Sequence, residues 1–147
     1  MISNLAFVHP DAILGENVVV EPFAYISGNV SIGDDSWIGP SATVFDGARI
    51  GRNCKIFPGA VISGIPQDMK FKGEETTAEL GDNTTVREGA TVNRGTVAAG
   101  KTLVGSNCLI MINAHVGHDC RVGDYCLLGN GTGLAQSSTF TSPARPV

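Results

Sequence analysis

Residues 8–62 read VHPDAILGENVVVEPFAYISGNVSIGDDSWIGPSATVFDGARIGRNCKIFPGAVI, with a branched aliphatic at every sixth position. These aliphatics are Val8, Leu14, Val20, Ile26, Ile32, Ile38, Val44, Ile50, Ile56 and Ile62. A period of six fits neither the repeat of an amphipathic helix, about 3.6 residues, nor the simple alternation of ordinary strands. Short fixed periods are typical of β-helix solenoids, in which equivalent residues of successive coils stack into one core.

The second half of each six-residue unit, or hexad, supports this interpretation. The residue four positions after each aliphatic is small: Ala12, Val18, Ala24, Val30, Ser36, Ala42, Ala48, Cys54 and Ala60. A small residue lets the chain turn a tight inner corner. Glycine often follows the aliphatic directly, as at Gly15, Gly33, Gly39 and Gly51, and we expect positive φ there because glycine adopts it without steric cost. Three hexads would make one triangular coil, so the predicted fold class is an all-β, single-stranded parallel β-helix.

The hexad frame breaks once and then resumes. Residues 64–79 place Asp68 and Glu74 where aliphatics should stand, and unpaired charges are too costly in a narrow apolar core, so we expect an external loop. The frame returns with Leu80, Val86, Val92, Ala98, Val104, Ile110, Val116, Val122, Leu128 and Leu134, Ala98 being its weak member. The sequence therefore predicts one β-helix domain over residues 1–135. We expect an irregular tail over 136–147, where prolines disfavour another coil although Phe140 and Ala144 are in frame.

Composition restricts the partners and the compartment. The formal net charge of −4 gives no basic footprint, so we expect no nucleic acid partner. There is no basic N-terminal segment followed by an apolar run, and no stretch of eighteen apolar residues, so we expect a cytoplasmic protein without a transmembrane segment. The four cysteines, Cys54, Cys108, Cys120 and Cys126, occupy the small position of their hexads. We therefore expect compact interior residues rather than metal or redox groups.

Polar residues depart most clearly from the repeat in NAHVGHDC, residues 113–120. Ala114 and Val116 are the inward residues, which leaves His115, His118 and Asp119 at outer and corner positions. An imidazole with an ordinary pKa near 6.5 can accept a proton from a hydroxyl, and a carboxylate can fix its tautomer. The residues alone leave open whether His118 is a general base or a solvated surface histidine.

Metal binding is the other reading of such residues. Catalytic zinc needs three protein ligands and an open position, whereas the chain has three histidines in all. His9 lies in the first coil, about six coils from the other two, and we expect it to be structural or simply exposed. The sequence therefore predicts no metal site and no cofactor.

Three motifs carry a family resemblance: PQDMKFKGE at 66–74, GDNTTVREGATVNRGT at 81–96 and MINAHVGHDCRVGDYCLLGNGT at 111–132. Over residues 5 to about 135 the chain resembles the UDP-N-acetylglucosamine O-acyltransferases of lipid A biosynthesis, which belong to the hexapeptide-repeat proteins. The resemblance implies left-handed coiling, which the period alone does not fix. It also implies a homotrimer with sites between neighbouring subunits, and transfer of a 3-hydroxyacyl chain from acyl carrier protein to the 3-hydroxyl of UDP-N-acetylglucosamine.

The resemblance also assigns residues. His118 matches the general base of the family and Asp119 its carboxylate partner. Gln67, Asp68, Lys70 and His115 match the substrate site, and we expect Asp68 and His118 to meet across a subunit boundary. The family's LAGH run, whose glycine amide stabilises the oxyanion, reads Leu134-Ala135-Gln136-Ser137 here, which places Gln136 at the substrate site. The family continues through more coils and a helical domain, so the sequence predicts a shortened chain.

Two other functions stay open. One is an acetyl-CoA-dependent hexapeptide acetyltransferase, which also uses a corner histidine but does not explain the PQDMKFKGE loop. The other is a non-catalytic trimeric scaffold, which the altered LAGH run favours.

Overall fold

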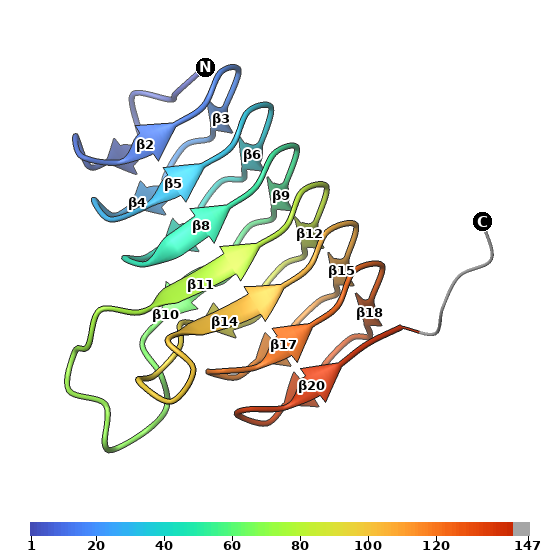
Figure 1. Ribbon diagram of the computed structural model, residues 1–147. Coiled ribbons are helices and arrows are strands. Elements are labelled where there is room, and N and C mark those ends of the chain that lie inside the picture. Colours follow the sequence, from blue (N-terminus) through green and yellow to red (C-terminus); the bar gives the residue numbers. More distant parts are fainter. Residues whose placement is uncertain (143–147) are drawn as a thin grey trace.

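The computed structural model describes residues 1–142 and winds them into a left-handed parallel β-helix with three flat faces (Figure 1). Sheet I contains β1 (Phe7–Val8), β4 (Tyr25–Ile26), β7 (Thr43–Val44), β10 (Val61–Gly64), β13 (Thr91–Asn93), β16 (His115–Val116) and β19 (Gly133–Leu134). Sheet II contains β2 (Ile13–Leu14), β5 (Ser31–Ile32), β8 (Ala48–Ile50), β11 (Thr77–Leu80), β14 (Lys101–Val104), β17 (Arg121–Val122) and β20 (Thr139–Phe140). Sheet III contains β3 (Val19–Val20), β6 (Trp37–Ile38), β9 (Lys55–Ile56), β12 (Thr85–Val86), β15 (Leu109–Ile110) and β18 (Leu127–Leu128).

The hexad aliphatics fill the interior as predicted. In sheet III, for example, Val20 pairs with Ile38 and Ile38 with Ile56, so equivalent side chains stack directly in successive coils. The small residues of the hexads are buried with them, including all four cysteines, which are free thiols in the core. Because one aliphatic and one small residue from each hexad point inward, the six-residue period is enough to specify the triangular coil.

The prediction of positive φ at the glycines that follow the aliphatics was wrong. Positive φ occurs three positions after the aliphatic instead, for example at Asn17 and Asp35. The glycines are required by close approach of the next coil: a Cβ on Gly15 would lie 2.3 Å from Oδ1 of Asp34. That carboxylate accepts the backbone N–H of Glu16 at 2.8 Å. The missing side chain thus makes room for an aspartate that caps the turn of the preceding coil.

The structure also changes two predicted boundaries and the assignment of one core residue. The external loop is 65–76, because residue 64 belongs to β10 and residues 77–79 to β11. Ala98 is not a core residue but lies exposed in a second loop, 94–100, so the core frame steps from Val92 to Val104. The regular winding continues past residue 135, because Phe140 pairs with Val122 and packs against the core. Residues 143–147, which include the in-frame Ala144, lie outside the described part of the chain.

Both loops leave the β-helix at the corner between sheet I and sheet II, in adjacent coils (Figure 1). We call this edge the I–II corner; it consists of the segments that connect each sheet I strand to the next sheet II strand. Residues 117–120 and 135–138 form the same corner in the two following coils. Winding the chain therefore aligns segments that are far apart in the sequence along one edge of the molecule.

Candidate functional site

The I–II corner contains a hollow where the residues singled out in the sequence gather. One part of it, with a volume of about 490 Å³, is lined by Gln67, Asp68, Met69, Lys70, Thr96, Ala98, His118, Asp119, Gln136 and Ser137. A smaller part is lined by Gln67, Asn93, His115, Gly117, His118, Leu134, Ala135 and Gln136. The two parts share Gln67, His118 and Gln136, so they form one site. All seven predicted site residues line it.

The 65–76 loop is held against the corner by Arg94. Its guanidinium carbon lies over the Phe71 ring, 5.2 Å from the centroid, and its Nη1 donates to the carbonyl of Asp46 at 3.1 Å. Within the loop, the backbone N–H of Lys70 donates to Oδ1 of Asp68 at 2.9 Å. The loop is thereby fixed beside His118 in the same chain. Asp68 and His118 therefore line one hollow within a single chain, and their meeting across a subunit boundary stays a prediction.

His118 and Asp119 form a buried pair. Nδ1 of His118 lies 3.2 Å from Oδ2 of Asp119, and the two residues are 9% and 7% exposed. Sequence neighbours in a strand would point to opposite faces. Here Asp119 has φ of 63°, and this left-handed corner conformation lets its carboxylate turn back to the imidazole. His118 is thus not a solvated surface histidine.

Asp119 is fixed by two threonines. It accepts hydrogen bonds from the backbone N–H of Thr96 at 2.8 Å and from the Thr96 hydroxyl, while its own N–H donates to Oγ1 of Thr102 at 2.9 Å. Burial alone would raise the pKa of Asp119, but the hydrogen bonds from Thr96 and His118 outweigh it and hold that pKa below its ordinary value. An ionised Asp119 accepts the proton of Nδ1, which leaves Nε2 of His118 to act as a base.

Thr96 was not predicted as a site residue. It ends the 81–96 motif, but it also occupies the small position of the hexad that begins at Val92, so the repeat accounts for it and no role was assigned to it. We expect Thr96→Val to lower kcat about tenfold, because one charge-assisted hydrogen bond, worth about 1.5 kcal/mol, is lost from Asp119. Steady-state kinetics would measure this, with Thr96→Ser restoring the rate and Thr85→Val, in β12 of sheet III and outside the hollow, as control. An unchanged kcat would contradict a positioning role.

His115 lies on the wall of the hollow, with Nδ1 at 2.7 Å from Oγ1 of Thr91 in the neighbouring strand. Burial, and secondarily the charge of His118, lower the pKa of His115. The imidazole is therefore neutral near pH 7 and can offer a hydrogen bond to a bound ligand without adding charge to the site.

The lowered pKa of His115 has a measurable consequence for stability. The unfolded chain, with an ordinary histidine pKa of about 6.5, binds a proton at a higher pH than the folded chain does. We therefore expect the free energy of unfolding to fall as the pH drops below about 6.5, and His115→Gln to make this decline shallower. Urea unfolding between pH 5 and 7.5 would measure the slope. Equal slopes in both proteins would contradict the assignment.

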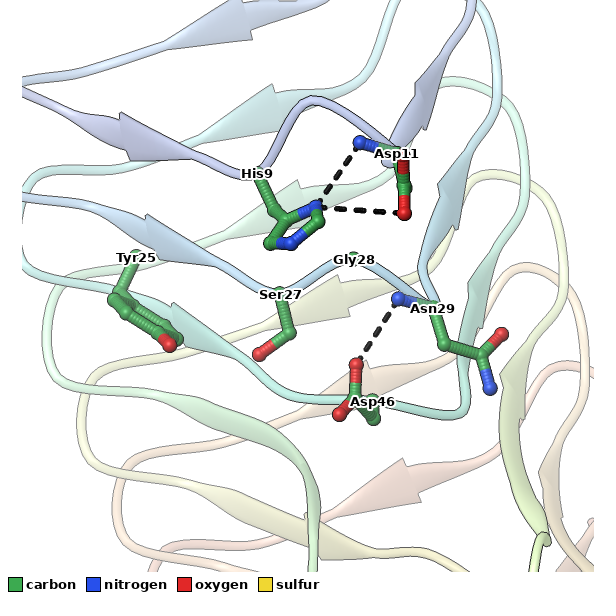
Figure 2. Close-up of a pocket in the computed structure, with 7 residues that line it drawn as sticks. All are labelled: His9, Asp11, Tyr25, Ser27, Gly28, Asn29 and Asp46. Carbon is green, nitrogen blue, oxygen red and sulfur yellow. Dashed lines mark hydrogen bonds and ion pairs between the residues drawn. The ribbon is translucent and has the colours of Figure 1, made fainter.

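His9 lines a separate hollow on the I–II corner of the first coils, together with Asp11, Tyr25, Ser27, Gly28, Asn29 and Asp46 (Figure 2). Its Nδ1 accepts the backbone N–H of Asp11 at 3.0 Å and lies 4.0 Å from Oδ2 of Asp11. As expected, His9 has a structural role in the turn of the first coil. Its distance from His118 makes it a suitable control in mutagenesis.

Two further observations concern residues 1–142. No three His, Cys, Asp or Glu side chains come together there as metal ligands would. That part of the chain also holds no helix of the length and apolar character needed to cross a membrane.

Comparison with known proteins agrees with this geometry. Residues 29–64 and 101–136 match the family of bacterial transferase hexapeptide proteins (six repeats). A UDP-N-acetylglucosamine acyltransferase from Bacteroides fragilis is 54% identical, with a TM-score of 0.93 over 95% of this chain and 55% of that one. The chain is thus similar in sequence and fold to the UDP-N-acetylglucosamine acyltransferases over about half of their length.

Other relatives support the same relationship. The Acinetobacter baumannii structure of this kind is 37% identical, with a TM-score of 0.92 over 94% of this chain and 54% of that one. A curated acyl-[acyl-carrier-protein]–UDP-N-acetylglucosamine O-acyltransferase from Anaeromyxobacter is 60% identical over 30 residues, which are 20% of this chain and 12% of that one. The chain thus spans about half the length of these solved structures, and its match to the curated protein covers 12% of that protein.

Proposed function

We propose that this chain is an O-acyltransferase that moves a 3-hydroxyacyl chain from acyl carrier protein to the 3-hydroxyl of UDP-N-acetylglucosamine, the first step of lipid A biosynthesis. The observation that carries the proposal is the buried His118–Asp119 pair, which shares one hollow with Asp68 and Lys70 of the loop. A base beside acidic and basic side chains suits an acceptor that carries both hydroxyls and phosphates. The relatives named above act on this acceptor.

The chemistry follows from the pair. Nε2 of His118 accepts the proton of the sugar hydroxyl as its oxygen attacks the thioester carbonyl, and Asp119 stabilises the imidazolium that forms. The tetrahedral intermediate collapses with cleavage of the C–S bond, and the carrier thiolate takes the proton back from His118. The products are the acylated sugar nucleotide and the free carrier thiol.

The remaining residues bind and orient. We assign Gln67, Asp68 and Lys70 to the sugar nucleotide and His115 to a second contact in the hollow. The backbone N–H of Gln136 would stabilise the oxyanion in place of the family's glycine amide. This nitrogen lies 3.1 Å from the point that a Cβ on Gly117 would occupy, so the absence of a side chain at residue 117 leaves the N–H of Gln136 accessible from the hollow.

We also infer a cytoplasmic homotrimer, as the family resemblance implies for the trimer, because a hollow on one prism edge is most easily closed by a neighbouring prism. Phe7, Tyr25 and Phe45 support an interface on sheet I. The ring centroids of Phe7 and Tyr25 are 5.1 Å apart, and those of Tyr25 and Phe45 are 6.1 Å apart. The three residues remain 40% to 49% exposed. Aromatic rings exposed in a row suit burial against another subunit.

A transfer assay tests the proposal and separates it from its alternatives. UDP-N-acetylglucosamine labelled in the sugar is incubated with the chain and a mixture of 3-hydroxyacyl carrier proteins, and in parallel with acetyl-CoA. We expect acylated product only with the carrier-protein donors. Product only with acetyl-CoA would favour the acetyltransferase, and no product with either donor would favour the scaffold.

A further inference from the structure

Residues 94–96, with the sequence Arg-Gly-Thr, directly follow β13 and contact both halves of the candidate site. One half is the His118–Asp119 pair, whose carboxylate accepts hydrogen bonds from the backbone N–H and the hydroxyl of Thr96. The other half is the 65–76 loop, which carries the residues assigned above to the sugar nucleotide. We call these three residues the 94–96 segment.

The backbone of the 94–96 segment closes the base of the loop. The N–H of Arg94 donates to the carbonyl of Gly64 at 2.9 Å, just before the loop, and the N–H of Gly95 donates to the carbonyl of Thr77 at 3.0 Å, just after it. Gly95 is packed so closely that a Cβ there would lie 2.4 Å from the backbone nitrogen of Lys101. The loop therefore leaves and rejoins the β-helix at points that the 94–96 segment fixes.

The side chain of Arg94 extends from this base into the loop. Its Nη1 donates to the carbonyl of Asp46 at 3.1 Å, and its Nη2 donates to the carbonyl of Glu74 at 3.5 Å. The guanidinium carbon also lies over the Phe71 ring. A guanidinium makes all three contacts because it has several donors and a flat face, whereas the ammonium of a lysine is a point charge. Arg94 thereby ties the interior of the loop to the I–II corner two coils earlier.

We propose that the 94–96 segment sets the position of the 65–76 loop relative to the His118–Asp119 pair, with Arg94 as a positioning residue for the acceptor. This role rests on the proposed acyl transfer. The hydroxyl that gives its proton to His118 belongs to the molecule that the loop binds, so the loop must be held at a fixed distance from the base. A loop that is ordered in advance costs less free energy to order on binding. Arg94 therefore acts on the affinity for the acceptor, while Thr96 acts on the base.

The test replaces Arg94 by methionine, which keeps the apolar stem but removes the donors and the charge. We expect KM for UDP-N-acetylglucosamine to rise about tenfold, because a hydrogen bond and a cation–π contact are lost. The KM for the acyl carrier protein donor, kcat at saturating acceptor and the pH midpoint of kcat/KM should change little, because Thr96 still holds Asp119. Arg94→Lys, which keeps a charge beside Phe71, should raise the acceptor KM less. An acceptor KM of Arg94→Met within threefold of the parent would overturn the proposal.

Arg87→Met is the matched control for Arg94→Met. The guanidinium carbon of Arg87 also lies over an aromatic ring, 4.5 Å from the centroid of Phe57, and its Nε pairs with Glu88 at 2.8 Å. Arg87 follows β12, however, and so lies on the corner between sheets III and I. The kinetic constants of Arg87→Met should equal those of the parent. Equal rises of the acceptor KM in the two variants would overturn a specific role of Arg94.

Digestion with trypsin gives a second readout that does not depend on turnover. Lys70 and Lys72 are exposed in the loop, so the rate of cleavage after them, identified by mass spectrometry, reports how firmly the loop is held. Arg94→Met should be cleaved there faster than the parent or Arg87→Met. Faster cleavage without any transfer by the parent chain would keep the positioning of the loop and refute the proposed function. Equal cleavage rates in Arg94→Met and the parent would overturn the positioning itself.

Discussion

Replacing His118 by alanine is expected to lower kcat for acyl transfer by about 10²- to 10⁴-fold, the range that a positioned general base contributes. The alanine removes the only group in the hollow whose free ring nitrogen is oriented by an ionised carboxylate, at 3.2 Å between Nδ1 and Oδ2 of Asp119. Because the two residues act as a unit, the double variant His118→Ala/Asp119→Asn should be little slower than His118→Ala alone. Single-turnover kinetics with labelled sugar nucleotide would measure both.

His9→Ala is the matched control for His118→Ala. It removes an imidazole from the same corner of the solenoid, where His9 only supports the turn at Asp11 (Figure 2). Its kcat should equal that of the parent chain. Equal losses in both variants would mean that the effect is structural, and a His118→Ala rate within threefold of the parent would remove His118 as the base.

Replacing Ile56 by alanine should destabilise the fold by about 2 to 5 kcal/mol. Ile56 is 0% exposed on the inward face of sheet III, between Ile38 and Val86 of the adjoining coils. Hydrogen-bonded coils above and below hold the backbone in place, so the cavity left by the missing atoms cannot close. The midpoint of urea unfolding, followed by the β-sheet signal in circular dichroism, would report the loss.

Ile13→Ala provides the comparison for Ile56→Ala. The same atoms are deleted from β2, but Ile13 is 70% exposed. The free energy of unfolding should therefore fall by only about a few tenths of a kcal/mol. Similar shifts for the two variants would contradict the inward direction of the hexad aliphatics. Because every coil uses the same two inward positions, that outcome would contradict the whole solenoid.

Part of the candidate site could be predicted from the sequence. The motifs NAHVGHDC and PQDMKFKGE supplied six of the seven predicted side chains and the run at 134–137 supplied Gln136, and the structure brings all seven to one hollow. Thr96 was given no role, although it ends the 81–96 motif. Thr96 satisfies the small position of its hexad and so looks structural.

The sequence by itself determined the solenoid, because a period of six with one bulky and one small inward residue has few other ways to bury its apolar side chains. It also determined that the loop lies outside the core, since charges replace aliphatics there. Only the tertiary structure decided what happens at the I–II corner. The contacts between Thr96, His118 and Asp119, the place of Asp68 beside them in a single chain, and the close approach that requires glycine all join residues of different coils. Such contacts depend on how one coil lies over the next, and spacing along the chain does not encode that directly.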